Sequence, residues 1–132
     1  MAAPKADDDA PTPKPLVFVH GEIKTPPFSE QARKEAGFLL GRLQIGESLG
    51  MPSAEPLPMV GPRCGAIRVR DAQHNWRIMY RIDPTVILVV DVYDKKTRAI
   101  PAAVIARCQK RLKNHDDAAK AARAKKDNND GR

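Results

Sequence analysis

The chain of 132 residues is poor in cysteine, histidine and aromatic residues. Its two cysteines, Cys64 and Cys108, lie far apart, with neither a CxxC pair nor a neighbouring histidine. This spacing excludes a disulfide scaffold and a cysteine-based zinc site. The three histidines have no ligand spacing either. We therefore expect no metal and no other cofactor.

Long apolar runs are also missing. The longest, residues 86–90, has the length of a strand, whereas a membrane-spanning helix needs roughly 18–20 apolar residues. The N-terminal segment lacks the apolar stretch of a secretory signal. We therefore expect a cytoplasmic protein that does not associate with membranes.

Acidic residues are outnumbered, because 23 Lys and Arg face 16 Asp and Glu, for a net charge of +7. Residues 107–132 contribute nine basic and four acidic side chains. Both ends are too polar to bury much apolar surface, so their ordering entropy is not offset. We predict a disordered tail over residues 1–14, one folded domain over 15–115, and a basic disordered or fraying tail over 116–132. The basic tail is either a solubilising end or an electrostatic arm for nucleic acid.

The apolar pattern predicts a small single α+β domain with the order β-α-β-β-β-α. Strands are expected at 16–20, 66–70, 76–82 and 85–93, with a polar connection over 71–75, and helices are expected over 29–45 and after Pro101. The first helix has Ser29 as its expected N-cap and an apolar stripe that includes Ala32 and Leu39. Residues 47–62 are rich in proline and are predicted to be a loop. In the second helix, Arg107 and Arg111 fall outside the apolar stripe.

The two middle strands alternate between arginine and apolar residues. If Val69 pairs with Ile78, four arginines gather on one face of the hairpin, with Arg70 opposite Arg77; these four are Arg68, Arg70, Arg77 and Arg81. Opposed like charges destabilise a sheet. The cluster therefore indicates either an anionic ligand or a solvated face that is neutralised by Asp71, Asp91 or Asp94.

The last strand carries two polar residues of interest. Asp91 interrupts an apolar run on the face that we assign to Ile87 and Val89, and burial there would require an arginine partner. Tyr93, close to Lys95, could stack on a base, assist proton transfer, or simply lie at the rim of the core.

The order of these elements resembles the RelE/ParE toxin superfamily over about residues 15–114, and most closely its HigB-like, phage-derived branch of type II toxin–antitoxin systems. The similar strings are EAGFLL, GAIRVR, WRIMYRID and VVDVYDKKTRAIP. The resemblance implies a RelE-like fold, with an antiparallel-rich sheet and the helices packed on one face. It implies a metal-independent, ribosome-associated mRNA endoribonuclease, whose partners are a cognate helix-turn-helix antitoxin and mRNA on the ribosome.

The resemblance also assigns roles to residues. Arg77 matches the phosphate-stabilising arginine, and Lys95 matches a basic residue that acts as stabiliser or acid. The implied catalytic residues are Arg77, Lys95, Arg70 and Tyr93, and the implied RNA-binding residues are Arg68, Arg81 and Lys96.

The chain departs from the family pattern at two positions. Ala66 replaces the first basic residue of its strand, and Asp91 stands where many phage-derived relatives have histidine. Two other functions therefore stay open: a non-catalytic module that binds nucleic acid or the antitoxin, and a gyrase-directed, ParE-like toxin.

Overall fold

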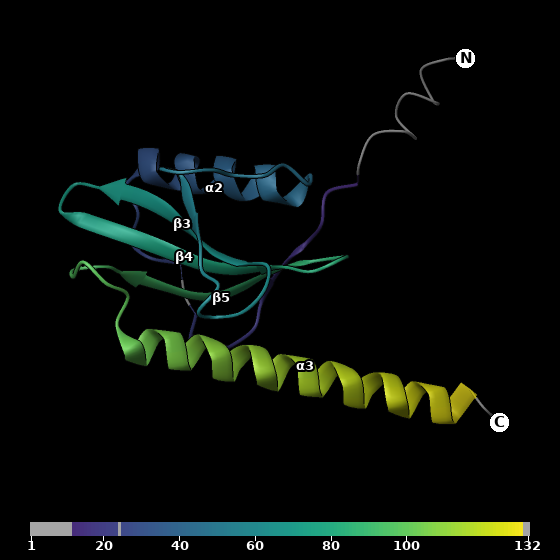
Figure 1. Ribbon diagram of the computed structural model, residues 1–132. Coiled ribbons are helices and arrows are strands. Elements are labelled where there is room, and N and C mark those ends of the chain that lie inside the picture. The colour runs from purple at the N-terminus through teal and green to yellow at the C-terminus, as the bar shows by residue number, and fades with distance from the viewer. Residues whose placement is uncertain (1–11, 24, 131–132) are drawn as a thin grey trace, which may run out of the picture.

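The computed structural model describes residues 12–130 except residue 24, with side chains as far as residue 126 (Figure 1). Its elements are β1 (Leu16–Phe18), α2 (Glu30–Gln44), β2 (Ala54–Pro56), β3 (Cys64–Asp71), β4 (His74–Ile82), β5 (Ile87–Asp94) and α3 (Ala102–Asp130). The expected α+β class is confirmed. None of the helices described is long and apolar enough to cross a membrane.

The five strands form one mixed sheet in the order β1-β5-β4-β3-β2. Only the pair β1 and β5 is parallel. The short edge strand β2 lies in the segment that we predicted to be a loop. The sequence did not indicate this strand, because three residues that end in proline show no detectable alternation. The pairing of this segment with β3 ends at the hydrogen bond from the Arg68 N–H to the Ser53 carbonyl oxygen (2.9 Å). Within the described residues, the edge of β3 beyond Arg68 therefore has no neighbouring strand.

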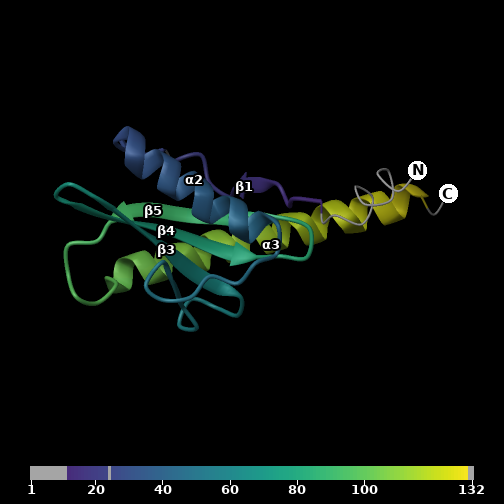
Figure 2. The same cartoon turned by 90° about the horizontal axis from the view of Figure 1, so that it is seen from above.

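The two helices cover opposite faces of the sheet, so the expectation that both pack on one face is wrong (Figures 1 and 2). The core on the α2 side contains Leu39, Ile67, Val69, Ile78 and Val89, among others. The core on the α3 side contains Ala66, Met79, Leu88, Val90 and Cys108, among others. Successive strand residues point to opposite faces, and here both sets are apolar in the middle of the sheet. Each face therefore needs a cover.

Helix α2 begins where the sequence predicts. The Ser29 Oγ accepts a hydrogen bond from the Ala32 N–H (3.1 Å), which is the expected N-cap. The Asp71 carboxylate accepts one from the Ser29 N–H (2.8 Å) and so ties the start of the helix to the end of β3. The predicted stripe is buried at Ala32 and Leu39, among others.

A β-bulge changes the alternation of β5. Met79 pairs with Asp91 while Tyr80 pairs with Val89, which leaves Val90 without a partner on β4. Val90 and Asp91 consequently both point to the α3 side of the sheet. Val90 packs in the core there, and Asp91 bonds arginines of α3. Our expectation that Asp91 shares a face with Val89 is therefore wrong, because a bulge leaves no mark in an apolar run.

Asp91 is buried, with 6% of its surface exposed, and it is paired with two arginines of α3. One oxygen accepts from the Arg107 Nε (3.2 Å) and the other from Arg111 Nη1 (3.2 Å), which also bonds the Val90 carbonyl oxygen (3.0 Å). The predicted pairing of Asp91 with arginine is confirmed. Arg111 itself is buried, although its position outside the apolar stripe predicts exposure.

Parts of both predicted tails lie among the described residues. Residues 1–11 of the predicted N-terminal tail lie outside the described residues, but the Lys14 N–H donates to the Gln44 carbonyl oxygen (2.8 Å). At the other end, residues 116–130 continue helix α3. Asp116 ties this helix to the sheet, since its two oxygens accept from the Arg81 guanidinium at 2.7 and 3.0 Å.

The Arg81–Asp116 pair predicts a pH-dependent part of the stability. The hydrogen bonds from Arg81 hold the pKa of Asp116 below its usual value, so the stabilisation is complete above the unfolded pKa of about 3.9 and is lost as the pH falls through the lower folded pKa. Because Asp116 is half exposed, we expect Asp116→Asn to lower the free energy of unfolding by about 1 kcal/mol at pH 7. Urea unfolding should show that this difference shrinks as the pH is lowered from 7 to 3.

The matched control is Asp117→Asn, which removes only the exposed pair with Lys113 and should cost about 0.5 kcal/mol or less. An Asp116→Asn deficit of the same size at pH 3 and pH 7 would contradict the assignment.

Candidate functional site

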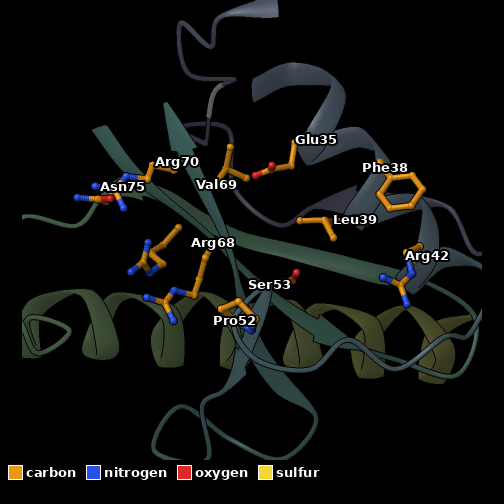
Figure 3. A pocket seen from close by; sticks show the side chains of 11 residues that line it. Glu35, Phe38, Leu39, Arg42, Pro52, Ser53, Arg68, Val69, Arg70 and Asn75 are labelled. Carbon is orange, nitrogen blue, oxygen red and sulfur yellow. The ribbon is translucent and has the colours of Figure 1, made fainter. Parts of the chain in front are cut away.

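A groove with a volume of about 510 Å³ lies between α2 and the β3–β4 hairpin (Figure 3). Arg70 and Asn75 lie at one end and Phe38 and Arg42 at the other. The groove is further lined by Glu35, Leu39, Pro52, Ser53, Arg68, Val69 and Arg77. It forms because β2 stops short and leaves that edge of β3 open. Three of the four predicted hairpin arginines therefore meet in one hollow.

The register within the hairpin differs from our prediction by two residues. Arg68, not Arg70, lies opposite Arg77, and Arg70 lies opposite Asn75. The strands continue to the pair Asp71–His74, so the turn contains only two residues, where the sequence suggested a polar connection of five. The assignment of faces is unchanged by a shift of two, and the two opposed like charges remain.

Arg77 occupies a special environment on β4. It is buried, with 6% of its surface exposed, yet its Nε has no hydrogen-bond partner. Among the described residues, its guanidinium makes one hydrogen bond, from Nη1 to the carbonyl oxygen of Trp76 (3.3 Å). Burial, and next the nearby charge of Arg68, lower the pKa of Arg77, although an arginine stays charged at any physiological pH. A buried cation of this kind is well suited to receive an anion.

Two other unpaired polar atoms lie around Arg77. Tyr93 is its direct neighbour on β5, and the Glu55 Oε1 on β2 lies 3.8 Å from the Arg77 Nε. The Tyr93 hydroxyl and the Glu55 Oε1 are buried and, like the Arg77 Nε, have no hydrogen-bond partner in the structure. Buried polar atoms without partners are rare in folded proteins. Three of them in one place make this the candidate site for a polar ligand.

The four strands β5, β4, β3 and β2 each contribute one member of this site. Tyr93, Arg77 and Arg68 form a cross-strand row, and Glu55 pairs with Ala66, two residues before Arg68. We call these four residues, Tyr93, Arg77, Arg68 and Glu55, the arginine row. Burial raises the pKa of Tyr93, so its hydroxyl is protonated at neutral pH and can donate a hydrogen bond.

Glu55 is the functional candidate that the sequence analysis missed. It lies in the proline-rich segment over 47–62, where neither of the two acidic residues belongs to a recognisable pattern. Gly65 is the one hint, because a Cβ there would lie 2.5 Å from the Tyr80 hydroxyl oxygen and 3.0 Å from the Glu55 carbonyl oxygen. A glycine inside a strand pattern often marks such a close approach. Here it admits both the Tyr80 ring and the β2 strand that carries Glu55.

The two lysines after β5 lie at the tip of the hairpin. The Lys95 N–H donates to the carbonyl oxygen of Asn75 (2.8 Å), which places Lys95 at the end of the hairpin where Asn75 lines the groove. Lys96 is exposed and pairs with Asp94 at 3.5 Å. Arg70 is exposed at the same end of the groove.

Arg81 is not brought to the groove. Its guanidinium is held by Asp83 at 2.7 and 2.9 Å and by Asp116, and these hydrogen bonds raise its pKa. It lies opposite Cys64, four residues along β4 from Arg77. The structure therefore gives Arg81 a part in joining α3 to the sheet, and the RNA contact that the resemblance implies for it stays a prediction.

The three aspartates that could have neutralised the arginines are engaged elsewhere. Asp71 bonds Ser29 and Asp91 bonds α3. Asp94 accepts from the Asn75 N–H (2.9 Å) and bonds the His74 ring (2.7 Å), which holds its pKa below the usual value. Within the described part of the chain, neither Arg68 nor Arg70 has an ion pair, and no three His, Cys, Asp or Glu residues are grouped to hold a metal ion. None of these three aspartates therefore neutralises the hairpin arginines; Arg77 and Arg81 pair with other carboxylates, and Arg68 and Arg70 keep their positive charge exposed to a ligand or to solvent.

Residues 26–113 match the model of a family described as phage-derived, Gp49-like proteins (DUF891). The chain belongs to this family. It is a toxin-like family related to the RelE and HigB types, and it fits a toxin of a toxin–antitoxin system with an antitoxin partner. The match spans the whole groove and the arginine row. A search of curated proteins found no match.

The arginine row predicts opposite effects of two neutralising substitutions on stability. Arg68→Gln removes the like charge opposite Arg77 and should raise the free energy of unfolding by about 0.5 kcal/mol. Glu55→Gln removes the carboxylate nearest to Arg77 and should lower it by about 1 kcal/mol. Urea unfolding at pH 7 measures both.

Arg33→Gln, on the exposed side of α2, is the matched control and should change stability little. If Arg68→Gln lowers the free energy of unfolding and Glu55→Gln leaves it unchanged, repulsion between Arg68 and Arg77 does not destabilise the row.

Proposed function

We propose that this Gp49-like toxin is a metal-independent endoribonuclease of the HigB-like type that cuts mRNA on the ribosome. The observation that carries the proposal is the buried Arg77, whose Nε has no hydrogen-bond partner and lies 3.8 Å from the Glu55 Oε1, beside a Tyr93 hydroxyl that also has no hydrogen-bond partner. Cleavage of RNA without a metal needs a cation for the phosphate, a proton acceptor and a proton donor, and the arginine row with Lys95 supplies all three.

The groove suits a single RNA strand. Arg68, Arg70 and Arg77 provide positive charge along it, and guanidinium groups bind phosphate through parallel hydrogen bonds. Phe38 leaves 66% of its surface exposed, and the Arg42 guanidinium lies 5.9 Å from its ring centre. An exposed aromatic ring beside cations is a typical platform for a stacked base. Phosphate and base can thus be held by the two ends of one hollow.

The reaction follows from the placement of these groups. The Glu55 carboxylate takes the proton of the ribose 2′-hydroxyl, and the 2′-oxygen attacks the adjacent phosphorus. Arg77 and Arg68 stabilise the negative charge that builds on the phosphate oxygens, and Tyr93 donates a hydrogen bond to one of them. The bond from phosphorus to the 5′-oxygen breaks, and Lys95 gives that oxygen its proton. The products are a 2′,3′-cyclic phosphate and a 5′-hydroxyl end.

Two departures from the family pattern fit this scheme. Asp91 is bound by Arg107 and Arg111, so it is not free to replace the histidine that many relatives have there. Ala66 contributes no charge, but Glu55 lies directly beside it on β2. The proton acceptor thus comes from the neighbouring strand.

The proposal includes the partner and the place of action. The toxin acts in the cytoplasm, where translated mRNA is found. A helix-turn-helix antitoxin neutralises it with an acidic or amphipathic segment, because the exposed basic groove attracts negative charge.

The mechanism predicts the kinetics of two variants on ribosome-bound mRNA. Arg77→Gln should cut 10²–10³-fold more slowly, roughly the cost of losing one transition-state contact. Glu55→Gln should slow cleavage by about 10²–10⁴-fold, since it cannot accept the proton. Mass analysis of the fragments should find 2′,3′-cyclic phosphate ends.

Circular dichroism and Arg77→Lys, which retains the charge in the buried site, separate a lost contact from a lost fold. Arg33→Gln serves as the active control. Cleavage by Arg77→Gln at the wild-type rate would refute the assignment of the site.

In cells, induction of the wild-type chain should stop growth and create new RNA 5′ ends within translated reading frames, whereas Arg77→Gln should do neither. Mapping of RNA 5′ ends after induction is the measurement. Growth arrest with intact mRNA and damaged DNA would point to gyrase instead. Unaffected growth would favour a module that only binds.

A further inference from the structure

Helix α3 continues far beyond the sheet that it packs on (Figures 1 and 2). Leu112 is its last residue in the core, and Asp116 is the last whose side chain bonds another element among those described. Residues 118–126 follow; all but the partly buried Ala119 are exposed. We call this segment, residues 118–126, the arm. It lies outside the family match, which ends at residue 113.

The arm has an unusual composition. Its sequence AAKAARAKK contains four basic residues, five alanines and no acidic residue. Alanine, lysine and arginine are strong helix formers, so this stretch can be helical without packing. At about 100° per residue, the side chains of Lys120, Arg123, Lys125 and Lys126 spread around the helix. The arm therefore carries positive charge on several sides and no apolar face.

We propose that the arm binds the phosphate backbone of RNA, at nucleotides other than those in the groove. Charge complementarity carries the proposal, because four cations within three helical turns match a dense polyanion. An acidic protein is a poorer fit. Protein interfaces depend on buried aromatic or large apolar anchors, and the arm has no side chain of that kind.

The geometry separates the arm from the groove. Arg81 lies four residues along β4 from Arg77, about 13 Å, and Asp116 on α3 is bonded to Arg81. The arm starts beyond that point and leads away from the sheet (Figure 1). Its contacts consequently add affinity without touching the reacting phosphate.

The test measures binding of the full chain to a single-stranded RNA of 2′-O-methyl nucleotides. This RNA cannot be cleaved by attack of the 2′-oxygen, because that oxygen is methylated. Lys120→Gln/Arg123→Gln is compared with Arg33→Gln/Lys34→Gln on the exposed side of α2, which removes the same charge. Glutamine retains the helix, and circular dichroism checks it. Each affinity is measured from low to high salt, and again with polyglutamate in place of RNA.

We expect the slope of log affinity against log salt to shrink by about 1.4 for the arm variant, with an affinity loss on the order of tenfold near 0.1 M salt. The α2 variant should keep the wild-type slope. Equal slopes for the two variants would overturn the proposal. So would a larger loss on polyglutamate than on RNA, which would assign the arm to an acidic protein. The RNA cannot be cut, so the outcome is independent of the proposed cleavage.

Discussion

The buried carboxylate of Asp91 is the constraint on which the arrangement of this domain depends. A charge inside the sheet must be paired, and both partners, Arg107 and Arg111, come from α3. The β-bulge at Val90 turns Asp91 toward that helix, and the same bulge brings Tyr93 onto the face of Arg77. One irregular residue therefore both anchors α3 and completes the arginine row.

The arginine row lowers the stability of the folded domain, and contacts elsewhere in the fold have to compensate for it. Arg68 and Arg77 face each other across two strands, and no carboxylate lies closer to the Arg77 Nε than Glu55, at 3.8 Å. Proteins rarely retain unpaired polar atoms in a buried place unless a ligand uses them. The apolar cores on both sides of the sheet stabilise the fold and compensate for the destabilising charges of the arginine row.

The sequence was sufficient to predict the order of the main elements, the cap at Ser29, the arginine partner of Asp91 and the shared face of Arg68, Arg70 and Arg77. These features follow from local periodicity and from the cost of burying charge. The hairpin register, the bulge at Val90 and the strand β2 depend on contacts between distant segments, which no local pattern records. Glu55 was missed for that reason. Of the two carboxylate partners of Arg81, Asp83 is only two residues away in the sequence, whereas Asp116 lies on α3 and has no local signal.

Helix α3 unites two stretches of very different local stability in one continuous element. From Val104 to Leu112 it is packed against the sheet, so its amides should exchange with solvent only when the domain opens. Beyond Asp116 the side chains described are exposed except for the partly buried Ala119, and the amides of this stretch can exchange by fraying. The arm can thus lose and regain its helical form while the core stays folded, and it can adapt its shape to a bound strand at little cost to the domain.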